Sequence, residues 1–231
     1  MPELSFNIKG VESAAKGLVP LLHFKLEVIN GDPEEVIENV LLQAQIQIQP
    51  TQRCYVAEEK EKLADLFGTP ERWGQTLRNQ FWAHSQATVR RFTGSTEVIL
   101  PVPCTYDLNV LGSKYFNALE GGDVSLLFLF SGSIFHHTDA GRLQVQQISW
   151  EKESSYRMPV TVWKEMMEHH YPNSAWLSLR RDVFDELAAY KRRHGLVTWE
   201  HVLQQLLANE QFAERSQRRN VSDEQAIKNL L

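Results

Sequence analysis

The sequence has few of the residues and runs that mark specialised classes of protein. Its 231 residues include two cysteines, Cys54 and Cys104, which is too few for a disulfide framework or a four-cysteine zinc site. The longest apolar run, around Leu126–Phe130, is far shorter than a membrane span, and no apolar signal-peptide core follows Met1. These absences predict a cytoplasmic protein with reduced cysteines and no membrane partner.

The formal net charge of −5 disfavours a dedicated nucleic-acid binder, because such proteins neutralise phosphates with lysine and arginine. Neither glycine-rich phosphate-binding motif occurs, and the zinc motif His-Glu-x-x-His is absent. The histidines of the His136–His137 and His169–His170 pairs are adjacent, so in a strand or helix they are poorly placed to share one ion. Paired carboxylates at Glu34–Glu35 and Glu58–Glu59 lie in highly charged stretches, which predicts solvated side chains. We therefore expect no metal and no cofactor.

Two stretches alternate apolar and polar residues with a period of two, which is typical of half-buried strands. They are residues 22–29 and 42–48, separated by a turn at residues 30–33. We expect the two strands to form an antiparallel pair. The second strand has a row of glutamines at every other position from Gln43 to Gln49. The row predicts a solvated outer face, with a polar binding ladder as the alternative.

The stretch 92–107 predicts a strand with an edge or a bend at Pro101 and Pro103, because proline cannot donate to a ladder. Residues 124–135 are apolar on both faces, as in a central strand, and residues 143–150 predict the last strand. A glycine inside the central strand, Gly132, favours a bulge or close backbone approach over a nucleophile turn.

Helical periodicity appears in three regions of the chain. Residues 58–67 and a second start at Thr69 form a helical insertion, residues 110–119 predict a further helix, and the chain is helical from about Met158. The predicted fold is therefore α+β, with a mostly antiparallel β-sandwich or curved sheet. We expect a β-rich domain at 1–150 with a helical insertion at 56–80, a helical part at 151–208 packed on it, and a tail at 209–231.

Four aromatic residues near the ends of the predicted elements are candidate protein-binding anchors: Trp73, Phe81, Trp82 and Trp176. The alternative for the first three is that they fill the open end of the sheet core. On the first hypothesis the protein is a non-enzymatic adaptor that binds another protein; whether it also self-associates stays open.

A second hypothesis is an enzyme whose site assembles around Cys104, with Tyr106, Asp107 and a distant histidine, His84 or His137. Such a nucleophile needs a thiolate promoted by a base or by a helix N-terminus. Cys104 lies on a predicted strand with no histidine near it in sequence, so a buried structural cysteine is the favoured interpretation.

A third hypothesis concerns DNA. Residues 175–181, the helix 182–194 and the helix after Gly195 resemble the strand–helix–helix order of ribbon-helix-helix antitoxins, which read bases with a paired β-ribbon. The exposed ribbon face would be Trp176, Ser178 and Arg180. The acidic remainder of the chain opposes this function.

Several motifs together resemble one bacterial family of unknown function: Leu66–Gly74, Phe92–Thr96, Pro101–Asp107, Leu129–Gly132 and Thr198–Glu200. The resemblance extends to about Leu207. Genes of this family lie beside uptake nickel–iron hydrogenase genes in some genomes. The resemblance therefore implies an accessory or maturation role, with a hydrogenase component as the partner, and it implies no catalytic residues.

Overall fold

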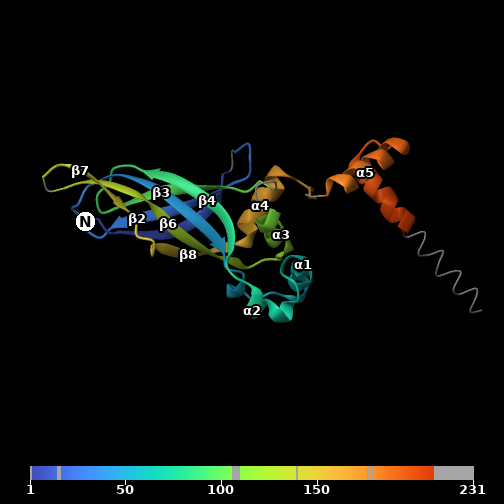
Figure 1. Ribbon diagram of the computed structural model, residues 1–231, viewed down its shortest axis with the longest axis horizontal. Helices are drawn as coiled ribbons and strands as arrows, with labels where there is room; N and C mark the ends of the chain where they lie inside the picture. The colour runs from blue at the N-terminus through green and yellow to red at the C-terminus, as the bar shows by residue number, and fades with distance from the viewer. Residues whose placement is uncertain are drawn as a thin grey trace, which may run out of the picture. The chain divides into compact units, whose positions relative to one another are not determined.

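The computed structural model describes residues 2–14, 17–105, 110–138, 140–175, 177 and 179–210. Its internal contacts divide the chain into two units, Met1–Ala175 and Trp176–Leu231. The boundary after Ala175 places the strand and the helix that follow residue 150 in the first unit. We describe each unit by itself (Figure 1).

Sheet A contains three antiparallel strands in the order β1-β2-β5. They are β1 (Leu4–Ser13), β2 (Leu21–Asn30) and β5 (Ser95–Pro103). In the described part of the chain β5 pairs with β2 alone, so Pro101 and Pro103 lie on an edge strand, which is one of the two predicted alternatives.

Sheet B contains five antiparallel strands, with β6 (Asp123–His137) at its centre. On one side of β6 lie β3 (Ile37–Ile48) and then β4 (Gln80–Val89). On the other side, β7 (Leu143–Gln147) pairs with the end of β6 and β8 (Glu153–Pro159) with its beginning. The sequence predicted the central place of β6 but not β8.

The expected pairing of the 22–29 and 42–48 strands is wrong. β2 pairs with β1 and β5, whereas β3 pairs with β4 and β6. The turn after Asn30 therefore carries the chain from one sheet to the other. Alternation of apolar residues fixes which face of a strand is buried, but it does not name the neighbouring strand.

The two sheets pack face to face over a core of apolar side chains. Phe24 of β2 lies edge-on to Phe128 of β6, with ring centroids 5.1 Å apart, and Phe6 of β1 stacks on Phe130 at 4.4 Å. A hydrogen bond from Ser85 Oγ to the carbonyl O of Pro101 (2.8 Å) links β4 to β5. The architecture confirms the predicted α+β class with an antiparallel sandwich.

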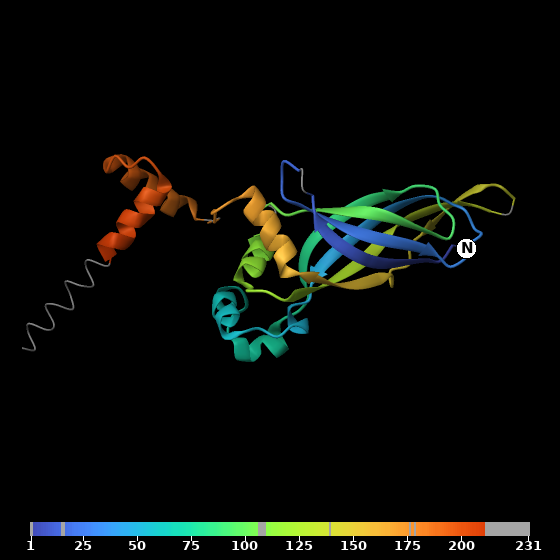
Figure 2. The same cartoon turned by 180° about the vertical axis from the view of Figure 1, so that it is seen from behind.

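Helices cover one end of this sandwich (Figures 1 and 2). Between β3 and β4 lie the short helices η1 (Pro50–Gln52), η2 (Pro70–Arg72) and α2 (Trp73–Thr76), together with α1 (Ala57–Phe67). They form the predicted helical insertion. Two more helices, α3 (Val110–Ala118) and α4 (Val160–His170), complete the cover.

The second unit contains α5 (Arg181–Arg193) and a helix at residues 199–210. Gly195 has a φ of +61°, a backbone conformation that glycine adopts without strain, and it follows the end of α5. Thr198 Oγ1 accepts a hydrogen bond from the N–H of His201 (3.3 Å), as expected for an N-cap. The rings of Phe184 and Trp199 pack at 5.2 Å. None of the described helices is both long enough and apolar enough to cross a membrane.

Candidate functional site

Part of the outer face of sheet B carries no lysine, arginine, aspartate or glutamate over three strands, although Asp123 of β6 and Glu153 and Arg157 of β8 lie on the same side beside it. Burial alternates along β3 and β6, and the strand register shows which side chains share the outward side. We call the following set the neutral face: Phe81, His84, Gln86 and Thr88 of β4; Leu41, Gln43, Gln45 and Gln47 of β3; and Ser125, Leu127, Leu129, Ser131 and Ser133 of β6.

A β-bulge shapes the corner of the neutral face nearest the helices. Ile46 of β3 pairs with Ala83 and Gln47 pairs with Phe81, so Trp82 is the extra residue. The bulge lets Trp82 turn into the core while Phe81 and His84 share the outer side, where their rings lie 4.8 Å apart. Phe81 is 52% exposed and Trp82 3%.

The neutral face is hollowed between β3 and β4 at the end opposite Phe81. This shallow depression has a volume of about 300 Å³, and the outward side chains that line it are Leu41, Gln43, Gln86 and Thr88. Leu41 lies opposite Thr88 and Gln43 lies opposite Gln86, so apolar and amide groups lie side by side in it. The surface therefore offers both contact area and hydrogen-bonding groups, without a charge that a partner would have to neutralise.

The four predicted protein-binding residues lie in different environments. Phe81 is exposed on the neutral face, and Trp176 lies outside the described residues. Trp73 and Trp82 are core residues at 6% and 3% exposure. Trp73 packs edge-on against the rings of Tyr55 (5.3 Å) and Phe67 (5.7 Å), and Trp82 packs against Phe116 (5.1 Å). Two large apolar rings at the open end of a sandwich gain more from burial there than at the surface, so these two are not available to a partner in this structure.

A buried ion pair ties the helical insertion to the start of β6. Arg53 and Glu59 lie 2.7 Å apart, with side chains 11% and 2% exposed. The Glu59 carboxylate also accepts hydrogen bonds from the N–H groups of Val56 (3.1 Å) and Glu120 (2.9 Å), and Arg53 donates to the carbonyl O of Gly121 (3.1 Å). The expectation of a solvated Glu59 is therefore wrong. A buried carboxylate with this many partners has a structural role.

Two tyrosines continue this polar cluster. The hydroxyl groups of Tyr55 and Tyr115 are hydrogen-bonded at 2.9 Å, and the Tyr55 hydroxyl donates to the carbonyl O of Pro50 (2.7 Å). Burial raises the pKa of both phenols above the ordinary value. Both hydroxyls therefore stay neutral donors at physiological pH.

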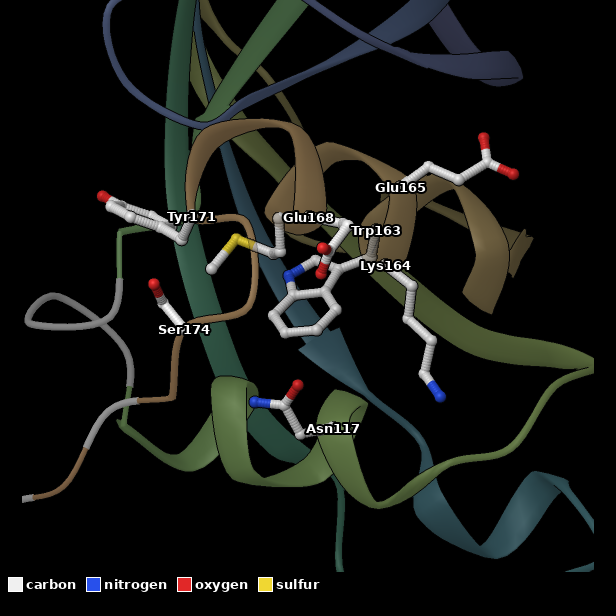
Figure 3. A pocket seen from close by; sticks show the side chains of 8 residues that line it. Asn117, Trp163, Lys164, Glu165, Glu168, Tyr171 and Ser174 are labelled. Carbon is white, nitrogen blue, oxygen red and sulfur yellow. The ribbon is translucent and has the colours of Figure 1, made fainter. Parts of the chain in front are cut away.

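Helices α3 and α4 border a second hollow, of about 420 Å³ (Figure 3). The indole of Trp163 faces it, backed by a stacked contact with Phe116 (5.0 Å). Lys164 and Glu168 of α4 lie beside the hollow and Asn117 of α3 lies across it. Glu168 already accepts a hydrogen bond from the N–H of Asn173 (3.2 Å). Charges of both signs give this hollow little selectivity for a charged ligand.

The cysteine of the enzyme hypothesis is deeply buried. Cys104 is 3% exposed, its thiol donates to the carbonyl O of Val102 (3.4 Å), and burial raises its pKa to about 12. A thiol in this state is a poor nucleophile because the thiolate is the reactive species. Tyr106 and Asp107 lie outside the described residues. Gly132 fits the close-approach interpretation, since an added Cβ would meet the carbonyl O of Leu41 at 2.0 Å.

The adjacent histidines have separate roles. His136 is 3% exposed with Nδ1 3.3 Å from a Glu35 oxygen, whereas the more exposed His137 lies 3.3 Å from Glu38. His170 of α4 has its two ring nitrogens 2.9 Å from the carbonyl O of Met166 and 3.2 Å from that of Gly17. Within the described residues, no group of three or more histidine, cysteine or acidic side chains could hold a metal ion.

Comparison with known protein families assigns the chain to one of them. The model of a family of unknown function, DUF6084, matches residues 1–216. The chain belongs to this family. No curated protein matches it.

Solved structures give weak likenesses. A β-glucosidase from Kluyveromyces marxianus aligns with 68% of this chain at 9% identity and a TM-score of 0.25. β-Glucosidase 3B from Thermotoga neapolitana aligns over 68% at 13% identity with a TM-score of 0.25. The matches cover 15% and 17% of those chains, so this chain spans a small part of their length. Scores this low carry no inference about function.

The sequence argument missed most of the neutral face. It singled out the glutamine row and Phe81, but it did not connect them with Leu41, His84 or the outward residues of β6. A signal was present: residues 39–49 and 124–135 contain no charged residue. Recognising it as one surface required the knowledge that β3 and β6 are neighbours.

Proposed function

We propose that this protein is a non-enzymatic adaptor or accessory protein that binds another protein through the neutral face. The observation that carries the proposal is the absence of charged side chains from the neutral face, which extends over three neighbouring strands in a chain that is 23% charged. Depletion of charge, with aromatic residues present, is the compositional mark of the centre of a protein interface.

The chemistry of the face defines the partner. An ionised group pressed onto it would lose its hydration without meeting an opposite charge, so the partner surface is uncharged. Gln43, Gln45 and Gln47 would supply amide donors and acceptors. Phe81 would supply the anchor, because it is a large aromatic ring that is half exposed in the free protein and gains apolar contact when a partner buries it.

The test compares two lysine substitutions at exposed hydrophobic residues. Phe81→Lys changes the neutral face, and Ile99→Lys changes β5 on the outer side of sheet A, where Ile99 is 39% exposed. Tagged full-length variants are used in pull-downs from the native organism at low salt, with quantification by mass spectrometry. We expect one stoichiometric partner with the wild type and with Ile99→Lys, and at least a tenfold loss with Phe81→Lys.

Two results would overturn the proposal. A partner that stays bound to Phe81→Lys would move the binding surface elsewhere, and a wild-type protein with no stoichiometric partner would remove the adaptor function. A cytoplasmic hydrogenase component is the first partner to examine, because the resemblance of the sequence implies that gene context.

The DNA-binding alternative depends on residues 175–181. Leu177, Leu179 and Arg180 are not in a strand, and Trp176 and Ser178 lie outside the described residues. This alternative therefore stays a prediction, and a gel-shift assay at low salt with random duplex DNA tests it.

A further inference from the structure

The outer edge of β7 lacks the features that protect the edges of β1 and β5. Proteins usually guard sheet edges with proline, charge, a bulge or a covering segment. β5 contains two prolines and is joined to β4 by the Ser85–Pro101 bond. β1 has Lys9 and a register shift between Ile8 and Gly10, and it meets β8 through a bond from the Ile8 N–H to Ser154 Oγ (3.4 Å). The sequence of β7, Leu-Gln-Val-Gln-Gln, has none of these devices.

The register shows which backbone groups of β7 point away from the sheet. The N–H of Ile148 donates to the carbonyl O of Gly132, and the N–H of Thr138 donates to that of Arg142, both at 2.9 Å. Because bonded and non-bonded pairs alternate in an antiparallel ladder, the even-numbered residues of β7 bond to β6. The backbone N–H and C=O groups of Leu143, Val145 and Gln147 therefore point outward. In the described part of the chain no backbone hydrogen bond joins them to another segment.

The side chains of the same residues are exposed. Leu143 is 60% exposed and Val145 51%. An uncharged edge with open hydrogen-bonding groups and exposed apolar side chains is a template for strand addition. β7 lies at the end of the sandwich away from the helices (Figures 1 and 2), and Phe81, next to the helical insertion in β4, lies at the other end of sheet B.

We propose that β7 pairs antiparallel with β7 of a second copy of this chain, about a twofold axis through Val145. The pairing joins two B sheets into one continuous sheet. With the axis at Val145, Leu143 lies opposite Gln147 of the other copy, and every outward N–H and C=O of these residues meets its partner. In a twofold contact β7 faces the identical strand of the other copy, so any charged residue near the axis would face a like charge. β7 contains no charged residue.

The same twofold axis also brings the exposed side chain of Trp150 into the interface. Trp150, 89% exposed, follows β7 in a turn closed by the bond from Lys152 N–H to the carbonyl O of Ser149 (3.1 Å). In the antiparallel register, residue 150 of one copy faces residues 140–142 of the other, in the turn between β6 and β7. A short ladder buries little area, and the indole supplies the aromatic anchor typical of an interface.

Charge substitutions at the axis test the pairing. In Val145→Lys and in Val145→Glu two like charges face each other across the axis, so each variant is expected to be monomeric at concentrations where the wild type is dimeric. An equimolar mixture of the two is expected to restore a heterodimer, because lysine then faces glutamate. Val145→Thr keeps a β-branched neutral side chain and is the matched control. Analytical ultracentrifugation of the full chain gives the dissociation constants, and native mass spectrometry identifies the heterodimer.

Three results would overturn the proposal. They are a wild-type protein that is monomeric throughout the micromolar range, a Val145→Lys variant that dimerises as tightly as the wild type, and charged variants that fail to associate when mixed although each is folded. Circular dichroism melts establish folding. If a charge at position 145 unfolds the chain, Trp150→Ala supplies the test, with at least a tenfold weaker dimer and an unchanged melting temperature. Loss of the Phe81-dependent partner would leave this dimer intact, so the two proposals fail separately.

Discussion

The outer faces of the two sheets differ in a way that their strand patterns do not. On sheet A the outward side chains include Lys9, Lys25 and Glu27, with ion pairs from Lys9 to Glu27 (3.2 Å) and from Lys25 to Glu12 (2.6 Å). On sheet B the outward charges are Asp123 of β6 and Glu153 and Arg157 of β8, and the neutral face beside them has none. Sheet A shows what a solvated face of this protein looks like, so the exposed but uncharged neutral face needs another explanation, and a bound partner is one.

Aromatic residues alone do not identify the candidate binding surface. Trp73 and Trp82 are large aromatic residues of the kind found in interfaces, yet they fill the core beneath the helices. Phe81, one residue from Trp82, is on the neutral face. Exposure and depletion of charge, rather than residue type, therefore mark the candidate surface.

The largest expected effect is a loss of stability from a substitution on the inward side of β4, with little change from one on its outward side. Trp82→Ala removes a 3% exposed indole and should lower the free energy of unfolding by about 3–5 kcal/mol, as for other large-to-small core substitutions. Phe81→Ala should change it by less than about 1 kcal/mol. Urea unfolding followed by tryptophan fluorescence for Phe81→Ala and by circular dichroism for both variants measures the difference. Equal losses would mean that Phe81 belongs to the fold and not to a binding surface.

The next largest effect is expected from removing a buried charge, and it should exceed the effect of removing a charge from the surface of sheet A. Glu59→Gln keeps the shape of the side chain but leaves Arg53 without its counter-charge, which should cost about 2 kcal/mol. The matched control, Glu12→Gln, breaks the Lys25 pair, whose side chains are 45% and 53% exposed, and should cost much less because water screens an exposed pair. Thermal or urea unfolding of the two variants at the same ionic strength gives the ratio. A larger loss for the surface pair would contradict the structural role of Glu59.

The smallest effect at neutral pH concerns the two cysteines. Cys54 is exposed and Cys104 is buried, so a thiol reagent at pH 8 should modify Cys54 rapidly and Cys104 only on unfolding. The pKa of Cys104 is raised to about 12 in the folded state from 9.0. The buried neutral thiol therefore makes its full contribution to the free energy of unfolding below pH 9, and this contribution is lost as the pH rises from about 9 towards 12. Rapid modification of both thiols at pH 8 would show that Cys104 is accessible.

Most of the elements could be predicted from the sequence, but their neighbours could not. The alternation in 22–29 and 42–48 located β2 and β3, and the two-sided apolar run located the central β6. The helical insertion followed from Thr69, Pro70 and the stripe ending at Phe67. β8 was missed because its residues, Glu153–Pro159, alternate weakly and include charged and small side chains.

The candidate surface was only partly accessible to sequence reasoning. Phe81 and the glutamine row were noticed separately, and Trp73 and Trp82 were grouped with Phe81 because all are aromatic. The bulge at Trp82 reverses the alternation of β4, and β4 contains no glycine that would have indicated it.

The sequence by itself determined most of the strands and helices, the inward and outward sides of β2 and β3, and the central place of β6, because these depend on the local period of apolar residues. Only the tertiary structure decided that β2 and β3 belong to different sheets, that Glu59 and Cys104 are buried, and that the uncharged stretches of β3, β4 and β6 form one surface. Burial and adjacency arise from segments far apart in the chain, and hydration and pairing depend on which of those segments meet.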